Sequence, residues 1–165
     1  MNVKDVCLLK YDNIKTDMLV FVRAKTVRTK RSVEAISVVI TKEVKTIINK
    51  WGNKNKSAKN YIFPVLTEGL TAHREWQLIQ QFTQVLNSHM KSIGKKLGIE
   101  SNITTYAARH SFATVLKRSG INTEFISEAL GHGSLKTTQS YLAGFEDDSK
   151  REAIKALTAF KNIAK

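Results

Sequence analysis

Three residues in the C-terminal half of the chain have side chains suited to chemistry: Arg109, His132 and Tyr141. Arg109 lies in a stretch, 104–114, whose apolar residues recur at helical spacing, so its guanidinium is expected to be buried or half-buried. A buried charge is costly unless an anion meets it. That anion is either a carboxylate from elsewhere in the chain or a phosphate held by two parallel hydrogen bonds.

His132 and Tyr141 each allow an ordinary interpretation and a chemical one. His132 directly follows Gly131, at the expected end of a helix, where a histidine can simply bond the last carbonyl groups. Tyr141 is by default a core or surface aromatic residue. If both lie near Arg109, however, His132 can donate to the same phosphate, and the Tyr141 hydroxyl can attack its phosphorus.

Short helices must position these side chains. The pattern predicts a helix over about 105–117, in which Tyr106, Arg109, Ala113 and Leu116 share one face. A second helix follows Asn122 as its cap and ends at Gly131, with its apolar side chains facing inward: Phe125, Ile126, Ala129 and Leu130. A third helix begins after Ser134 and carries Leu135, Thr138, Tyr141 and Leu142. A last helix begins near Glu146, with an apolar stripe of Ile154, Leu157 and Phe160.

The N-terminal half predicts a β-hairpin with a basic tip. Residues 18–22 and 33–40 are apolar strand-like runs, and five cations lie between them: Arg23, Lys25, Arg28, Lys30 and Arg31. The tip is either a solvated loop or a contact to a nucleic-acid backbone, and the total charge favours the second. Thr41 then caps a helix that carries Val44, Ile47, Ile48 and Trp51 at i, i+3, i+4 and i+7 spacing. A long helix over 72–93 has an inner stripe of Ile79, Phe82, Leu86, His89, Met90 and Ile93. The predicted fold class is therefore α+β: mostly helical, with a small antiparallel sheet near the N-terminus.

Composition points to a single basic domain that binds nucleic acid. The chain has 165 residues and a formal net charge of +13, from 27 Lys and Arg against 14 Asp and Glu. One cysteine, Cys7, excludes an internal disulfide and is expected to be a buried thiol in a reducing cytoplasm. No run of 18 apolar residues is present, so we expect a soluble, cytoplasmic protein with no membrane partner. The cysteine and the four histidines show no metal-ligand spacing, so no metal site is expected.

Taken together, these motifs resemble the catalytic domain of tyrosine recombinases, the phage integrase family, and in particular integrases of bacterial mobile elements. The resemblance rests on three segments in the family's order: Ala108–Thr114, Leu130–His132 and Thr138–Leu142. It extends upstream to 5–14 and to Phe21–Thr26, and so covers nearly all of the chain.

The resemblance implies a role for each residue. Tyr141 attacks a DNA phosphodiester and forms a 3′-phosphotyrosyl link, Arg109 and His132 hold the phosphate oxygens, and Lys25 protonates the leaving 5′ oxygen. Tyr106 is a further catalytic candidate: it stands where the family usually has a histidine, and it can donate a hydrogen bond but is a poor base near neutral pH. Asn2 stands where the family's first catalytic arginine belongs, with Asp5 at the acidic end of that pattern. Arg23, Arg28, Lys30 and Arg31 are expected to contact DNA. No cofactor is implied, because the covalent link conserves the bond energy.

The resemblance also implies a larger protein. Family members carry an N-terminal DNA-clamping domain, so we expect 1–165 to be a single catalytic domain and a fragment of a longer enzyme. That enzyme would work in a bacterial cytoplasm on double-stranded DNA, as a tetramer that joins two DNA sites. The apolar stripe of the last helix either docks on a neighbouring subunit or packs on its own domain.

Two other functions compete with recombination. One is a DNA-binding module without catalysis, in which 114–130 forms a helix-turn-helix. Its second helix offers Glu124 and Glu128 and no basic residue, which suits a phosphate-rich groove poorly. The other is RNA binding, for which the chain has no aromatic stacking signature.

Overall fold

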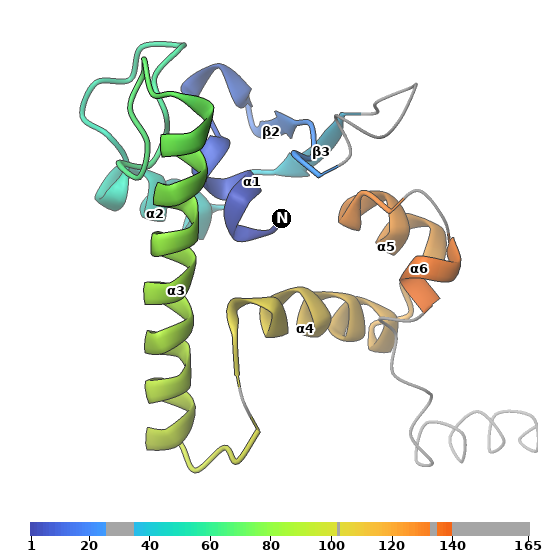
Figure 1. Cartoon of the computed structure of the whole chain (residues 1–165). Coiled ribbons are helices and arrows are strands. Elements are labelled where there is room, and N and C mark those ends of the chain that lie inside the picture. Colours follow the sequence, from blue (N-terminus) through green and yellow to red (C-terminus); the bar gives the residue numbers. More distant parts are fainter. Residues whose placement is uncertain (26–34, 102, 133–134, 140–165) are drawn as a thin grey trace, which may run out of the picture.

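The chain folds as a mostly helical α+β structure with a small antiparallel sheet, as the sequence predicts (Figure 1). The computed structural model describes residues 1–25, 35–101, 103–132 and 135–139. The N-terminal elements are α1 (Val3–Leu8), a 3₁₀ turn (Tyr11–Asn13), β1 (Ile14–Lys15), β2 (Met18–Phe21) and β3 (Ile36–Val39). The helices that follow are α2 (Lys42–Trp51), α3 (Ala72–Lys96), α4 (Thr105–Arg118), α5 (Thr123–Leu130) and α6 (Leu135–Gln139).

The predicted hairpin is confirmed at its base. Strands β2 and β3 pair antiparallel, with Met18 opposite Val39 and Phe21 opposite Ile36. Alternate residues face the core, so Leu19 and Phe21 are buried. Strand β1, which the sequence pattern did not predict, pairs with β2 on the other side. Residues 26–34, which include Arg28, Lys30 and Arg31 of the predicted tip, lie outside the described residues.

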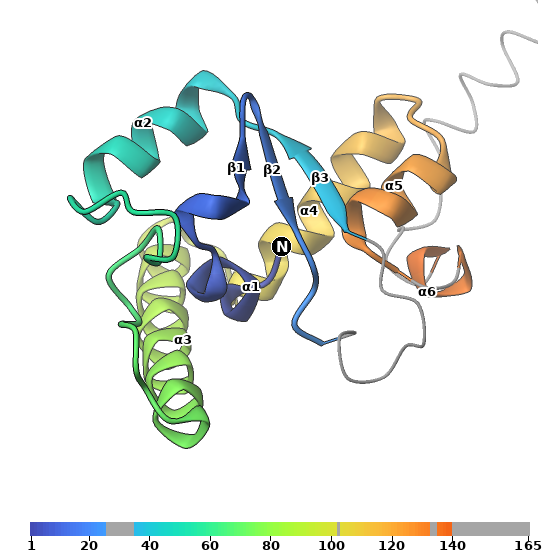
Figure 2. The same ribbon diagram turned by 90° about the horizontal axis from the view of Figure 1, so that it is seen from above.

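Three groups of buried side chains hold the elements together. The sheet packs with α2 around Leu9, Leu19, Phe21, Ile36, Ile40, Ile48 and Ile62. Helix α1 packs on α3 through Cys7, Tyr61, Leu66 and Ile79. Helices α4 and α5 meet through Ala113, Ile126 and Leu130. Seen from above, α5 lies beside β3, so the end of α5 comes close to the base of the hairpin (Figure 2).

Local capping signals place the helix ends where the sequence predicts them. Thr41 caps α2 through Val44, and Asn122 caps α5 by accepting from the backbone N–H of Phe125 at 2.8 Å. Gly131 ends α5 with a φ of 62°, in the left-handed region that favours glycine. A Cβ at Gly131 would also collide with Ile36 Cδ1 and Arg23 Cδ. Glycine is therefore required there both by its φ and by its close neighbours.

Several apolar helix positions are more exposed than their spacing suggests, and the predicted inward position is wrong for Phe125, His89 and Ile93. Ile47 and Trp51 of α2 are 50 % and 62 % exposed, and they line an apolar groove of about 750 Å³ with side chains from α3. Phe125 is 52 % exposed, although Ile126 beside it is buried. At the far end of α3 both His89 and Ile93 are exposed. Periodicity finds the apolar face of a helix, but it does not show how much of that face a neighbour covers.

Two further predictions concern Cys7 and membranes. Cys7 is buried, as predicted, and burial raises the pKa of its thiol to about 11, so the thiol is protonated at neutral pH. In the described ranges, no helix combines the length and the apolar character that crossing a membrane requires.

Candidate active site

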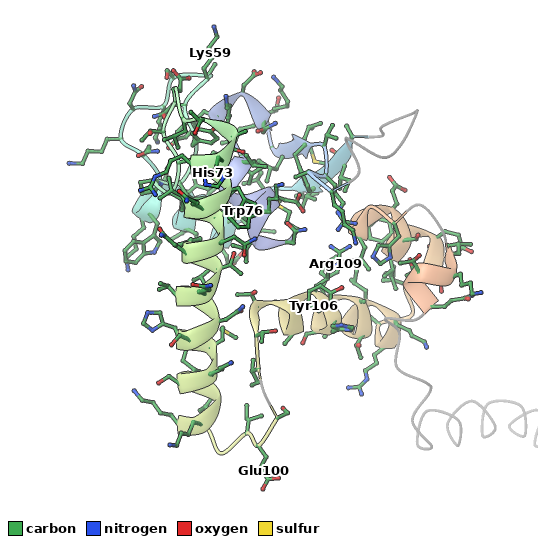
Figure 3. All side chains as sticks on the ribbon, viewed as in Figure 1. Lys59, His73, Trp76, Glu100, Tyr106 and Arg109 are labelled. Carbon is green, nitrogen blue, oxygen red and sulfur yellow. The ribbon has the colours of Figure 1, made fainter. Side chains whose placement is uncertain are left out.

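Arg109 is the centre of the candidate site. It lies on α4, is only 5 % exposed, and projects toward the side of α4 on which the N-terminal elements lie (Figure 3). Its Nη2 donates to the backbone carbonyl of Leu130 and lies 2.9 Å from Nε2 of His132. Burial, followed by the charge of Arg23, lowers the pKa of Arg109. A guanidinium has five donors in one plane, so one side chain can be anchored to the protein and also contact an oxyanion.

His132 is oriented from both sides of its ring. Because a guanidinium can only donate, Nε2 of His132 must accept from Arg109. The proton then belongs on Nδ1, which lies 2.8 Å from Oγ1 of Thr138 and donates to it. The His132 backbone N–H is bonded to the carbonyl of Ser127, so the residue is fixed to the end of α5.

The surroundings of His132 favour its neutral form. Desolvation and the positive charges of Arg109, Arg23 and Lys25 lower its pKa from 6.5 to about 4. Three positive side chains from two separate parts of the chain therefore act on this ring. A site with this charge suits an anionic group.

The two hairpin cations that the structure describes, Arg23 and Lys25, differ in their exposure to solvent. Lys25 is exposed and its charge reaches His132. Arg23, expected at the exposed tip, is instead held inside, with 11 % of its side chain exposed. Its Nη1 donates to the carbonyls of Leu130 and Gly131, both at 3.1 Å. The inward direction depends on the approach of α5, which lies more than 100 residues away in sequence, so the local pattern gave no signal of it.

The remaining predicted site residues are less completely placed. Tyr106 lies one turn before Arg109, is 48 % exposed, and contacts the ring of His110 edge-on at 5.1 Å. Tyr141 lies outside the described residues, two positions beyond the end of α6. Ser134, the predicted cap of α6, also lies outside them.

Asn2, at the place of the family's first arginine, caps a helix. Its Oδ1 accepts from the Asp5 backbone N–H at 2.8 Å, and Asp5 Oδ2 accepts from the Asn2 N–H at 3.1 Å. Asp5 is 3 % exposed, and its other oxygen accepts from the backbone N–H of Ala24 at 3.0 Å. The sequence indicates Asp5 only as the acidic residue of the family's first-arginine pattern. It does not show the hydrogen bond that Asp5 accepts from Ala24 of the hairpin.

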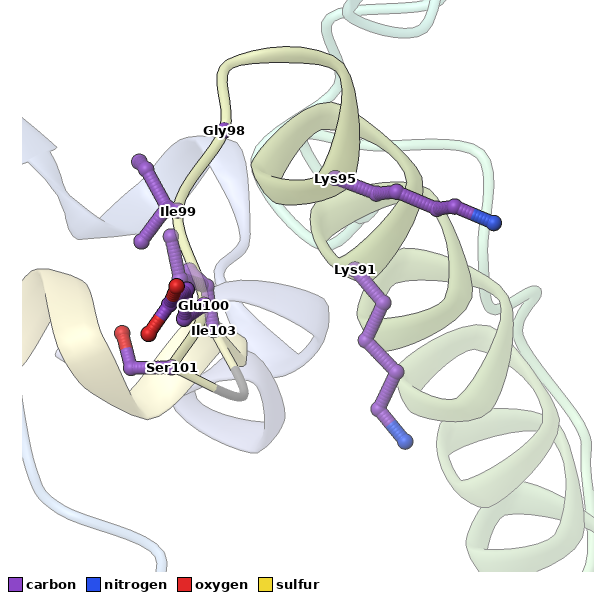
Figure 4. Close-up of a pocket in the computed structure, with 7 residues that line it drawn as sticks. All are labelled: Lys91, Lys95, Gly98, Ile99, Glu100, Ser101 and Ile103. Atoms are coloured by element: carbon purple, nitrogen blue, oxygen red, sulfur yellow. The ribbon is translucent and has the colours of Figure 1, made fainter.

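Thr138 is the second residue whose contact the sequence did not predict. It was expected only as a member of a short helix, whereas in the structure it is fully buried and is the partner of His132. A hollow elsewhere, between the end of α3 and the segment leading to α4, is lined by Lys91, Lys95, Gly98, Ile99, Glu100, Ser101 and Ile103 (Figure 4). The described residues that line it include neither a histidine nor a tyrosine, and its lysines extend away from the Glu100 side, so these residues offer no comparable constellation.

The fold is similar to solved structures of a recombinase and a transposon integrase. The XerA recombinase crystal structure matches 94 % of this chain with a TM-score of 0.58 at 24 % identity, and the match spans 52 % of that chain. The Tn1549 transposon integrase, in complex with a circular intermediate DNA, matches 94 % with a TM-score of 0.61 at 16 % identity, over 54 % of its length. The fold is therefore that of a tyrosine recombinase catalytic domain.

Sequence comparison then gives the family. The model of the phage integrase family matches residues 1–147, and the chain belongs to that family. The tyrosine recombinase XerA of Saccharolobus solfataricus is 31 % identical over 133 residues, which cover 81 % of this chain and 39 % of XerA. The chain thus spans well under half of this relative and about half of the solved structures it matches.

Proposed function

We propose that this chain carries the catalytic part of a site-specific DNA recombinase. The observation that supports this most directly is the convergence of Arg109 and His132, whose nitrogens lie 2.9 Å apart although the residues are 23 positions apart. Family membership supports the same reaction, since the named relatives are tyrosine recombinases. The substrate in this proposal is double-stranded DNA, which suits a net charge of +13.

The proposed reaction exchanges one phosphodiester for another. The Tyr141 oxygen forms a bond to phosphorus, the bond from phosphorus to the 5′ oxygen breaks, and Lys25 gives that oxygen its proton. A tyrosine hydroxyl with a pKa of about 10 needs a cationic pocket to lose its own proton at neutral pH, and in this proposal that proton passes to solvent water. Arg109, with His132 beside it, supplies fixed positive charge and donors for the phosphate oxygens. Rejoining is the reverse step with a new 5′ hydroxyl.

His132 must change its hydrogen bonding to take part. At neutral pH its Nε2 accepts from Arg109, whereas a phosphate oxygen needs a donor. A bound phosphate brings negative charge, which raises the pKa of His132 and lets Nε2 carry a proton. Arg109 can then turn its donors toward the phosphate together with His132.

A covalent trap tests this proposal. The chain is incubated with a pool of nicked duplexes whose central segment is randomised, and adducts that survive denaturation are recovered and sequenced. We expect wild type to form an adduct that Tyr141→Phe abolishes and that Arg109→Ala reduces by about 100-fold or more. An adduct that survives Tyr141→Phe would show that another residue is the nucleophile. Tight, sequence-specific binding without any adduct would instead support the DNA-binding module.

The assembly and the location belong to the same proposal. We infer a tetramer on two DNA sites, in the cytoplasm of a bacterium, from the resemblance to mobile-element integrases. Mass photometry of the protein on its recovered duplex tests the tetramer, and only monomeric complexes would contradict it.

A further inference from the structure

We infer that Arg23 is a positioning residue that fixes Lys25 relative to Arg109 and His132. This inference rests on the proposed reaction, in which Lys25 is the general acid. Three observations around the base of the hairpin carry it: a shared carbonyl, a close backbone approach and a buried carboxylate.

The first observation is the carbonyl of Leu130, which accepts from two arginines. Nη2 of Arg109 donates to it from α4, and Nη1 of Arg23 donates to it from the hairpin at 3.1 Å. Arg23 also reaches the carbonyl of Gly131, the residue directly before His132. One short segment at the end of α5 therefore ties the hairpin to the phosphate-binding side chains.

The second observation is how closely the Arg23 side chain packs on that segment. A Cβ at Gly131 would overlap Arg23 Cδ, so the arginine stem lies directly on the glycine backbone. Only 11 % of the Arg23 side chain is exposed. A guanidinium taken out of water to this extent needs fixed partners, and such partners hold it in one geometry.

The third observation is Asp5, which contacts the same part of the hairpin as the end of α5 does. One of its oxygens accepts from the backbone N–H of Ala24 at 3.0 Å, and the other lies 3.9 Å from Nε of Arg23. Asp5 is itself buried. Arg23 and Ala24 are thus both anchored immediately before Lys25, whose own side chain is exposed and whose charge acts on His132.

A sulfur substrate separates this role from general support of the fold. In the duplex recovered from the covalent trap, the bridging 5′ oxygen is replaced by sulfur. The thiol that leaves has a pKa of about 8.5, so it departs as a thiolate without help from an acid, whereas an alkoxide does not. We expect Arg23→Gln to slow adduct formation by about 100-fold on the oxygen substrate, as a displaced catalytic group does, and to come within about 3-fold of wild type on the sulfur substrate.

A double-mutant comparison gives a second readout. If Arg23 acts through Lys25, Arg23→Gln combined with Lys25→Ala is no slower on oxygen than Lys25→Ala alone. Arg74→Gln is the matched control, because it removes the same charge from an exposed arginine on α3. It should leave the rates of adduct formation on the oxygen and sulfur substrates unchanged. Arg23→Lys keeps the charge but not the planar set of guanidinium donors, so its rate of adduct formation on the oxygen substrate should lie between those of wild type and Arg23→Gln. If Arg23→Gln does not fold, Arg23→Lys replaces it in the test.

The outcomes distinguish this inference from the proposed function. Three results would overturn the role of Arg23 alone. They are an equal loss of rate for Arg23→Gln on the oxygen and sulfur substrates, no loss of rate on either substrate, or a double mutant in which the losses of Arg23→Gln and Lys25→Ala add in full. A wild-type protein that forms no adduct on either substrate would overturn the proposed reaction, and the role of Arg23 with it. If the sulfur substrate restores the rate of adduct formation for both Arg23→Gln and Lys25→Ala, the positioning role of Arg23 and the proposed reaction are both supported.

Discussion

At the scale of single residues, the candidate site depends on a neutral histidine held between a donor and an acceptor. Arg109 donates to Nε2 of His132, and Nδ1 of His132 donates to Thr138. A protonated ring would have to donate at both nitrogens and would oppose the guanidinium. The hydrogen-bonding pattern and the lowered pKa therefore describe the same state.

We predict that this state makes the fold sensitive to acid. The His132 pKa is about 4 in the folded chain against 6.5 ordinarily, so between these values the unfolded chain binds the proton more readily. The contribution of His132 to stability is complete above pH 6.5 and is lost as the pH falls toward 4. Urea unfolding at pH 7 and pH 5 should show a larger loss for wild type than for His132→Gln.

Ring-nitrogen NMR measures the same property directly. His132 in the free protein should stay neutral, with the proton on Nδ1, throughout the pH range in which exposed histidines titrate. Addition of the recovered duplex should raise its pKa, because a phosphate then lies at the ring. A free-protein titration near 6.5 would show that the surroundings do not hold the ring neutral.

At the scale of elements, the end of α5 is the junction on which the site is built. Gly131 combines a left-handed φ of 62° with contacts to Ile36 of β3 and to Arg23, and the next residue is His132. Strand, hairpin base and helix end therefore meet at a residue that has no side chain. Any atom added there must push these elements apart.

We predict that Gly131→Ala destabilises the protein by about 3 kcal/mol, from left-handed strain together with overpacking. Gly120→Ala is the matched control, because Gly120 also has a positive φ, 78°, but nothing lies within 4 Å of the position that an added methyl group would occupy. It should cost only about 1 kcal/mol. Urea unfolding of both variants makes the comparison, and similar losses would show that the contacts at Gly131 contribute nothing.

The elements were more predictable than their contacts. Asn122, Gly131 and Thr41 mark helix ends by local chemistry, and the sequence placed those ends correctly. Helix α1 was missed because six residues are too few to show a helical period. The inward direction of the Arg23 side chain was not predicted because the carbonyls it contacts belong to Leu130 and Gly131, which only the tertiary fold brings near.

At the scale of the whole molecule, the positive charge is spread over many surfaces, and only some of it is expected to meet DNA. The charge of Lys25 acts on His132 of the candidate site, whereas Lys54, Lys56 and Lys59 are exposed on the loop after α2. That loop lies at one end of the molecule, away from Arg109, as the labelled Lys59 shows (Figure 3). Net charge alone therefore does not identify the DNA-binding surface.

We predict that the hairpin cations contribute more to DNA binding than an equal number of cations on this loop. Each phosphate contact contributes about 0.9 to the slope of log Kobs against log salt concentration. Changing Arg28, Lys30 and Arg31 together to Gln should lower that slope by about 2 to 3 and weaken binding at all sequences alike. The triple change Lys54, Lys56 and Lys59 to Gln removes the same charge and should alter the slope by less than about 1.

Fluorescence anisotropy of a labelled duplex between about 50 and 200 mM salt measures both slopes. The comparison is matched in net charge, so a general loss of attraction affects the two triple variants equally. Direct contacts affect only the variant that loses them, because each contact releases counterions from the DNA. Equal slopes for the two variants would contradict a hairpin that reaches the DNA backbone, and would leave Lys25 and Arg109 to meet the phosphate without it.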